Sequence, residues 1–345
     1  MISKNQIEEI REHLEKSQNP IFFFDNDNDG LCSFLLMRRK IGRGKGVPIK
    51  SYPDLNTDYF KKVKEFNSDY IFILDKPVVS EDFLEQVRKE NLPLVWIDHH
   101  KAEIPKQKWI NYYNPLYNGK TNEPVSYISY KITNKKEDIW IAVVGCISDA
   151  LIPDFYKDFE KTYPELSKKN PKSAFDLLFN SQIGEIARIM DFSLKDSTTR
   201  VIQMLDFMME VKSPYDLIEE NEKTKRILAK YREINERYKN LFEEIKNQSD
   251  KKLIFFSYGG KFSISANLAN RSKYEFPDKY IVVGHKKPGE SFYNFSLRGN
   301  DIRNITLEAI KNIESASGGG HKDATGARIP EDKIEFFKEN IEKLI

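Results

Sequence analysis

Four short apolar runs in the first hundred residues constrain the fold of this chain most strongly. They are rich in aromatic and β-branched residues, and helical patterns such as 30–40 and 80–90 separate them. The runs are PIFFF (20–24), VPIKSY (47–52), YIFIL (70–74) and LPLVWI (92–97). Continuous apolar strands that alternate with helices predict an α/β domain whose parallel sheet is covered on both faces. In such sheets, ligands bind at the carboxyl ends of the strands.

The rest of the chain predicts a helical region and then a second, smaller α/β domain. The helical region ends in a long charged helix with apolar residues at i, i+3, i+4 and i+7 spacing, which suits a connector. From 251 onward the alternation resumes, with strands expected at 251–258, 280–285 and 292–298 and helices at 263–270 and 305–313. We therefore expect an N-terminal domain over 1–210, a connector helix over 211–250 and a C-terminal domain over 251–345.

Composition excludes several classes of protein. Of the 345 residues, 39% are hydrophobic and 31% are charged, which is typical of a soluble globular chain. The N-terminal segment is an amphipathic helix pattern without the apolar centre of a signal peptide, and no run is long enough to span a membrane. The two cysteines lie in apolar runs, so we expect reduced core thiols, a cytoplasmic location and no membrane partner. Since the net charge is only +2, any nucleic acid must bind a local basic groove.

The segment DNDNDG (25–30) places three carboxylates in one turn directly after the first predicted strand. An EF-hand would need a bidentate Glu at the twelfth position, where this chain has Leu36, and a helix before the loop. A turn that is rich in Asp and Asn for steric reasons alone is the simpler alternative. However, carboxylates packed this tightly repel one another unless a cation holds them together. The segment therefore predicts metal ligands at Asp25, Asp27 and Asp29.

Further metal ligands follow the other predicted strands. Asp75 ends YIFILD, and WIDHHK supplies Asp98, His99 and His100. Asp149 ends the apolar helical pattern IAVVGCISDA. Taken alone, Asp75 also suits a helix cap and Asp149 a C-terminal turn. Mixed carboxylate and imidazole ligands favour a pair of manganese or magnesium ions over structural zinc, which prefers thiolate-rich sites.

These motifs, in this order, resemble the DHH phosphoesterase superfamily. Three later segments resemble the associated DHHA1 domain, whose hallmark is a Gly-Gly-Gly-His segment. They are SISANLANRS (263–272), NFSLRG (294–299) and SGGGHKDATGA (317–327). The resemblance runs from about residue 20 to 330. It implies a DHH domain, a helical connector and a DHHA1 domain, with the active site in the cleft between the two domains.

The resemblance also implies roles for single residues. Members of this family hydrolyse phosphoesters or phosphoanhydrides at two divalent ions, usually manganese. By this analogy, Asp27 and Asp75 bind the first ion with Asp25 nearby, while Asp29, Asp75, His99 and Asp149 bind the second. His100 is expected to contact the substrate phosphate, and Asp98 to orient a histidine. Asp75, Asp98 and His100 are thus the expected catalytic residues.

One position departs from the family pattern. Many members place a histidine four residues before the second aspartate of the first motif, where this chain has Phe23. Either Asp25 supplies the missing ligand or the first ion is held weakly.

Substrate contacts are expected from the second domain. Gly318, Gly319 and Gly320 can expose backbone N–H groups to a phosphate, His321 opens the following segment, and Arg298 offers a bidentate guanidinium. The alternatives are a flexible glycine linker and a surface arginine. The basic run 38–46 is expected either to line a nucleic-acid path or to be a helix C-terminus favoured by the helix dipole.

Three functions agree with the resemblance. The first is an exonuclease like RecJ and its archaeal relatives, acting on single-stranded DNA, RNA or both, because 181–218 resembles the segment that follows the fourth motif in archaeal RecJ-like proteins. The second is a nanoRNase or cyclic-dinucleotide phosphodiesterase, which is restricted to very short substrates. The third is a catalytically weak scaffold that binds replication or repair proteins. A pyrophosphatase is less favoured, since those relatives carry a different C-terminal domain.

Overall fold

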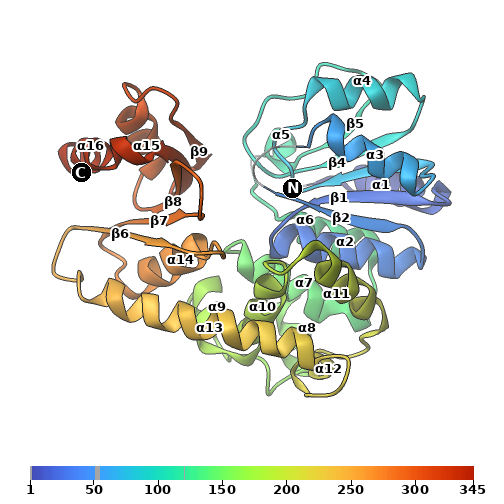
Figure 1. The fold of residues 1–345 in the computed structure, drawn as a ribbon. Coiled ribbons are helices and arrows are strands. Elements are labelled where there is room, and N and C mark those ends of the chain that lie inside the picture. The colour runs from blue at the N-terminus through green and yellow to red at the C-terminus, as the bar shows by residue number, and fades with distance from the viewer. Residues whose placement is uncertain (1, 51–54, 120) are drawn as a thin grey trace. The chain divides into compact units, whose positions relative to one another are not determined.

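The computed structural model describes residues 2–50, 55–119 and 121–345. The chain divides into two compact units, Met1–Leu228 and Ala229–Ile345 (Figure 1). The elements of the first unit, up to the helix that crosses the boundary, are α1 (Lys4–Lys16), β1 (Pro20–Asp25), α2 (Asn28–Ile41), β2 (Lys45–Ile49), α3 (Thr57–Glu65), β3 (Tyr70–Leu74), α4 (Glu81–Lys89), β4 (Leu94–Ile97), β5 (Asn111–Tyr113), α5 (Pro115–Gly119), α6 (Val125–Thr133), η1 (Lys136–Asp138), α7 (Ile139–Ser148), α8 (Tyr156–Thr162), α9 (Ala174–Asn180), α10 (Gln182–Ser193), α11 (Thr198–Glu210), α12 (Tyr215–Ile218) and α13 (Lys225–Lys246).

The first unit is built on a parallel sheet with the strand order β2-β1-β3-β4-β5. Successive side chains of a strand point to opposite faces, so the run Phe22-Phe23-Phe24 contributes to two hydrophobic cores. Phe22 and Phe24 pack in the core beneath α2, α6 and α7, whereas Phe23 packs with residues of α3 and α4 on the other face (Figure 1). The predicted parallel sheet with two covered faces is confirmed.

The predicted strands of this sheet differ from the observed ones mainly at their ends. The run 70–74 is β3 as expected, while β2 lies at Lys45–Ile49 and the predicted positions 51 and 52 fall outside the described residues. The sequence analysis missed β5, because its three residues are too few to show a period of two. The long charged helix is α13, which begins at Lys225, so most of 211–224 consists of turns and the short helix α12.

The second unit is a smaller α/β structure. Its remaining elements are β6 (Leu253–Gly259), α14 (Ser265–Glu275), β7 (Tyr280–Lys286), β8 (Phe292–Arg298), α15 (Ile302–Ile310), β9 (Ser317–His321), β10 (Ala324–Pro330), η2 (Glu331–Lys333) and α16 (Ile334–Leu344). The sheet order is β6-β7-β8-β10-β9, in which only the β6–β7 pair is parallel. The expected second α/β domain is confirmed.

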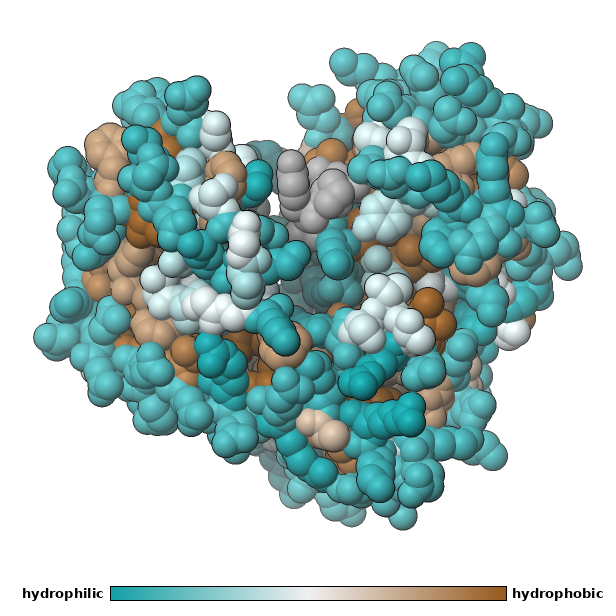
Figure 2. Space-filling model, in the orientation of Figure 1, coloured by the Kyte–Doolittle hydropathy of each residue, from teal (hydrophilic) through white to brown (hydrophobic). Residues whose placement is uncertain are grey.

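Surface composition agrees with a core in each unit. Figure 2 shows hydrophilic residues over most of the visible surface of both units, with small hydrophobic areas scattered among them. Among the described helices, none combines the length and the apolar character that a membrane crossing requires.

Candidate metal centre

The acidic residues of the first unit converge at one edge of its sheet. Asp25 is the last residue of β1, Asp75 follows β3, and Asp98 follows β4. Because β1, β3 and β4 are adjacent and parallel, their carboxyl ends meet at the same edge. Asp27 and Asp29 enter from the N-terminus of α2, where Asp27 accepts a hydrogen bond from the backbone N–H of the first turn.

Glycine at position 30 allows α2 to begin directly against the end of β1. A Cβ atom on Gly30 would lie 2.4 Å from the backbone oxygen of Asp25 and 2.7 Å from its backbone nitrogen. Instead, the amide of Gly30 donates to Asp27 Oδ1 at 3.0 Å and caps the helix. The close approach brings the carboxylates on both sides of this turn, Asp25, Asp27 and Asp29, to the same place.

Four predicted ligands form what we call the inner group, Asp29, Asp75, His99 and Asp149. His99 Nε2 lies 3.3 Å from Asp75 Oδ1, 3.5 Å from Asp149 Oδ2 and 4.0 Å from Asp29 Oδ2. Asp29, Asp75 and His99 are buried, and their ligand atoms are close enough to share one ion. The fold therefore brings together an imidazole and three carboxylates from four separate segments of the chain.

A contact with Asn122 orients His99 within the inner group. Its Nδ1 lies 2.9 Å from Oδ1 of Asn122, which directs Nε2 toward the carboxylates. Burial lowers the pKa of His99, but Asp149 and Asp29 outweigh burial and raise it. A proton and a metal ion thus compete for the same nitrogen. Asn122 was not predicted, because an exposed asparagine between two helices has no sequence signal for this role.

Asp29 has a second set of partners in α6. Its carboxylate accepts hydrogen bonds from the backbone N–H groups of Val125 at 2.7 Å and Ser126 at 2.9 Å, and from the Ser126 hydroxyl. Burial raises the pKa of Asp29 to about 6, although His99 and the hydrogen bonds from Ser126 act in the opposite direction. The helix terminus therefore holds this carboxylate in place and stabilises its charge.

Asp75 shows the clearest sign that the cluster fits a cation. Its φ is +61°, in the left-handed region, which Asp and Asn adopt more readily than most other non-glycine residues and which here sets the direction of the side chain. Its Oδ1 is buried and accepts no hydrogen bond from the described residues. Burial, followed by Asp29 and Asp27, raises the pKa of Asp75 well above its usual range. An oxygen left in this state is costly unless a proton or a metal ion binds it.

The outer group consists of Asp25, Asp27 and Asp75, whose oxygens also lie close enough to share an ion. Here the structure adds a residue that sequence reasoning missed. Lys76 is buried, and its Nζ lies 3.1 Å from Asp25 Oδ1. Phe23 contributes no ligand, because its side chain has no donor atom, and its ring is fully buried against that of Phe83.

The expected substrate-contacting histidine has a fixed orientation. His100 Nδ1 lies 2.9 Å from Asp98 Oδ1, and its backbone N–H donates to the other oxygen of Asp98 at 3.2 Å. Asn114 Nδ2 donates to the backbone oxygen of His100 at 2.9 Å. Burial lowers the pKa of His100, but the hydrogen bond to Asp98 and the charge of Asp75 outweigh it and raise the pKa to about 9.

The second unit contains the other expected substrate contacts. Arg298 lies at the end of β8, where its Nε donates to Asn270 Oδ1 at 2.6 Å and its Nη1 to the backbone oxygen of Leu297 at 2.8 Å. Gly318, Gly319 and Gly320 form the middle of β9, which pairs with β10 and is the edge strand of the sheet. The glycine-rich segment is therefore a strand and not a flexible linker. His321 ends that strand, so the expectation that it opens the following segment was wrong.

The arginines of the basic run 38–46 form hydrogen bonds and an ion pair within the first unit. Arg38 Nε donates to the backbone oxygen of Gly44 at 2.8 Å, and Arg43 Nε donates to that of Ser17 at 2.7 Å. Arg39 forms an ion pair with the fully buried Asp138 at 2.7 Å. These contacts favour the structural interpretation of the run over a nucleic-acid path.

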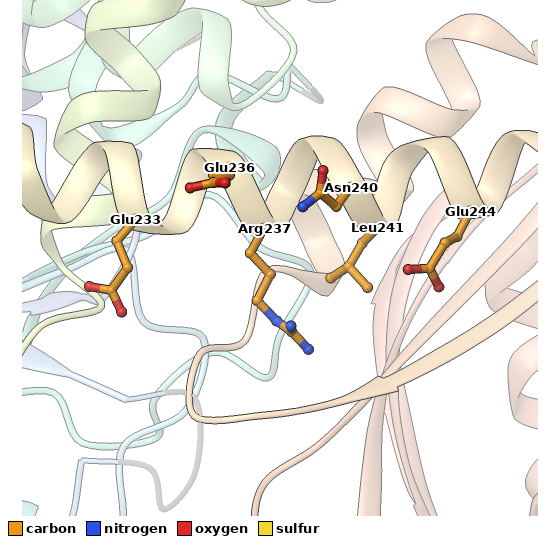
Figure 3. A pocket seen from close by; sticks show the side chains of 6 residues that line it. All are labelled: Glu233, Glu236, Arg237, Asn240, Leu241 and Glu244. Carbon is orange, nitrogen blue, oxygen red and sulfur yellow. The ribbon is translucent and has the colours of Figure 1, made fainter.

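A pocket elsewhere in the chain contains none of the predicted site residues. Figure 3 shows the side chains of α13 that line it, with the guanidinium of Arg237 pointing away from the helix axis. Arg237 Nη2 donates to the backbone oxygen of Gly259 at 2.8 Å. The lining residues are Glu233, Glu236, Arg237, Asn240, Leu241 and Glu244. All six lie on α13, and none of them belongs to the candidate metal centre.

The pKa shifts lead to a prediction about stability and pH. A raised pKa in the folded protein means that folding favours the protonated form, so stability falls as the pH rises from the unfolded to the folded pKa. For Asp29 this window is about 4 to 6, and for His100 about 6.5 to 9. The free energy of unfolding of chelated protein should therefore fall by about 1–3 kcal/mol across these windows.

Urea unfolding at several pH values, with EDTA and with Mn²⁺, measures this effect. A cation at the cluster should cancel the loss, so the stabilisation by Mn²⁺ should increase with pH. A stabilisation by Mn²⁺ that is equal at pH 5 and pH 8 would contradict the assignment of the raised pKa values to this cluster.

Comparisons with known proteins identify a domain family and several structures of similar fold. Residues 250–345 match the family model of the DHHA1 domain. Among solved structures, the chain is similar to RecJ from Thermus thermophilus in complex with Mn²⁺, with a TM-score of 0.67 and 14% identity over 99% of this chain and 54% of that chain. It is also similar to an exonuclease RecJ bound to manganese, with a TM-score of 0.61 and 14% identity over 100% and 94% of the two chains.

A third similar structure is CDC45 from Entamoeba histolytica, with a TM-score of 0.52 and 10% identity over 98% of both chains. This chain spans about half of the Thermus RecJ, and 94% of the other RecJ chain. A sequence search of curated proteins finds no match. At these identities the structural likeness establishes the fold alone.

Proposed function

We propose that this chain, which combines a DHHA1 domain with the fold of RecJ, is a metal-dependent phosphodiesterase that hydrolyses single-stranded nucleic acid from an end. The observation that carries the proposal is the convergence of the inner group on the unpaired Oδ1 of Asp75. A cluster of buried carboxylates around an imidazole is suited to Mn²⁺ or Mg²⁺. Thermus RecJ has been solved in complex with each of these ions.

Each residue of the cluster has a proposed role in metal or substrate binding. Asp29, Asp75, His99 and Asp149 would hold an ion in the inner group, and Asp27 and Asp75, with Asp25 nearby, would hold a second in the outer group. Divalent ions held there would supply Lewis-acid chemistry to a phosphoryl oxygen. Asp98 orients His100, which would bind a non-bridging oxygen of the phosphate. The surrounding buried side chains exclude bulk water and so strengthen these charge interactions.

We propose that residues of the second unit bind the substrate of this reaction. Arg298, the backbone of Gly318, Gly319 and Gly320, and His321 would hold the strand. We assign the DHH domain to 1–210, the connector to 211–250 and the DHHA1 domain to 251–345. Replication or repair proteins are candidate partners, as is a very short oligonucleotide.

Removing the guanidinium of Arg298 should separate substrate binding from chemistry. Arg298→Ala is expected to weaken binding of a single strand by ~1.5–3 kcal/mol, the usual contribution of a hydrogen bond to a charged group. The loss should shrink as salt rises, because part of the contact is phosphate neutralisation. Hydrolysis of bis-p-nitrophenyl phosphate should change little. Since Arg298 also bonds to Asn270, thermal unfolding of the variant serves as the control for folding. An equal loss on both substrates would exclude a role in binding alone.

A length series of labelled single-stranded DNA and RNA, digested with Mn²⁺, tests the proposed function. An exonuclease should convert strands of all lengths to mononucleotides. Hydrolysis of only dinucleotides to pentanucleotides would identify an oligoribonuclease-like or cyclic-dinucleotide enzyme instead. No hydrolysis of any substrate, together with retained Mn²⁺ binding, would favour a catalytically weak scaffold.

A further inference from the structure

We infer that Lys76 supplies a fixed positive charge to the outer group, so that this chain binds one divalent ion tightly and a second one weakly. The inference rests on the proposed metal-dependent function and concerns the number and affinity of the ions. Its evidence is the ion pair of Lys76 with Asp25, the ligands that remain in each group, and the burial of Phe23.

The ion pair between Lys76 and Asp25 lies inside the protein. The side chain of Lys76 is 3% exposed and that of Asp25 is 20% exposed, and 3.1 Å separates Nζ from Oδ1. A buried ammonium needs a carboxylate partner, because an unpaired charge is costly in a low-dielectric interior. Asp25 is such a partner, so one of the three carboxylates of the outer group is paired with a side chain of the protein.

The backbone of the turn after β3 places Lys76 at this position. Asp75 has its left-handed φ, and the Nε1–H of Trp96 donates to the backbone oxygen of Lys76 at 2.7 Å. The turn directs the carboxylate of Asp75 into the cluster and the next side chain toward Asp25. Asp75 and Lys76 therefore present opposite charges to the same set of carboxylates from consecutive positions.

The outer group has few ligands left to offset this charge. Asp27 is exposed and already accepts the capping hydrogen bond of Gly30, and Asp75 is shared with the inner group. Among the described residues, the group of Asp25, Asp27 and Asp75 includes no imidazole. Phe23, which lies on the same face of β1 two residues before Asp25, has no ligand atom and is fully buried against Tyr59 and Phe83.

The inner group differs from the outer group in its ligands and in the charges beside them. It includes the imidazole of His99, whose orientation Asn122 maintains. Over the part of the chain that the structure describes, no lysine or arginine forms an ion pair with Asp29 or Asp149. A divalent ion in the inner group thus meets three carboxylates without a nearby ammonium, whereas one in the outer group is repelled by Lys76. The two positions should differ in affinity for this reason.

Equilibrium dialysis of metal-stripped protein against Mn²⁺, with the bound metal quantified, measures the number and affinity of the ions. Wild-type protein should bind one Mn²⁺ per chain tightly and a second with a Kd at least tenfold higher. Lys76→Met keeps most of the side-chain volume and removes the charge, which frees Asp25. Its second Kd should fall at least tenfold toward the first. Lys76→Gln provides a second neutral variant if the methionine variant does not fold.

Two control variants isolate the charge at this position. Lys76→Arg retains the positive charge and should bind Mn²⁺ like the wild type. Lys168→Met removes the charge from an ion pair outside both groups, 2.6 Å from Asp176, and should also leave both Kd values unchanged.

The outcomes separate this inference from the proposed function. Two equally tight ions in the wild type, or an unchanged second Kd in both neutral Lys76 variants, would overturn the inference and leave a metal-dependent enzyme. Absence of Mn²⁺ binding by the wild type would overturn the proposed function as well.

Discussion

Asp75→Asn should lower the turnover of any phosphoester substrate by about a hundredfold to a thousandfold, the usual cost of removing a major charge-stabilising group. Asp75 is the one carboxylate that belongs to both the inner and the outer group. Its Oδ1 accepts no hydrogen bond from the described residues and lies 3.3 Å from Nε2 of His99, a position that suits a bound proton or cation. Asparagine preserves the shape of the side chain and removes its negative charge, so the fold should be retained.

Single-turnover hydrolysis of a labelled oligonucleotide and of bis-p-nitrophenyl phosphate measures the effect on both substrates. Both rates should fall together, because the change affects the chemical step. Asp82→Asn, an exposed aspartate in the first turn of α4, is the matched control and should retain full activity. Wild-type turnover in Asp75→Asn would show that Asp75 is not shared between the two groups.

Removal of divalent metal should abolish activity, with a loss of at least about a hundredfold in excess EDTA. Asp29 and Asp75 are buried and their pKa values are raised. Without a cation, these carboxylates therefore bind protons in place of the metal ion that activates the substrate. Readdition of Mn²⁺ should restore the rate, and Mg²⁺ should restore it in part. Circular dichroism of the chelated protein controls for unfolding. Undiminished hydrolysis in EDTA would exclude the metal centre as the catalytic site.

The sequence by itself determined the plan of the first unit and most of the candidate site. Strand periodicity is a local property, so β1, β3 and β4 can be recognised from their apolar runs. Parallel strands end at a common edge, and residues directly after them must therefore meet. For this reason Asp25, Asp75 and Asp98, which are far apart in the chain, could be assigned to one site.

Local composition left the glycine-rich segment undecided. Glycine is depleted in strands, so a flexible linker stayed open as an alternative for 318–320, yet pairing with β10 makes 317–321 the edge strand β9. Whether such a segment is a strand depends on hydrogen bonds to a neighbouring strand. The local sequence of the segment does not show which residues will pair with it.

Only the tertiary structure decided how the carboxylates of the cluster are used. Asp29 accepts hydrogen bonds from α6, 96 residues later in the chain, and Asn122 orients His99 from a position without any sequence signal. Lys76 follows Asp75 in the sequence, but only the left-handed turn after β3 brings its ammonium to Asp25. The charge balance of the site depends on such contacts, since Coulomb energies are set by distance and burial in the folded protein and not by spacing along the chain.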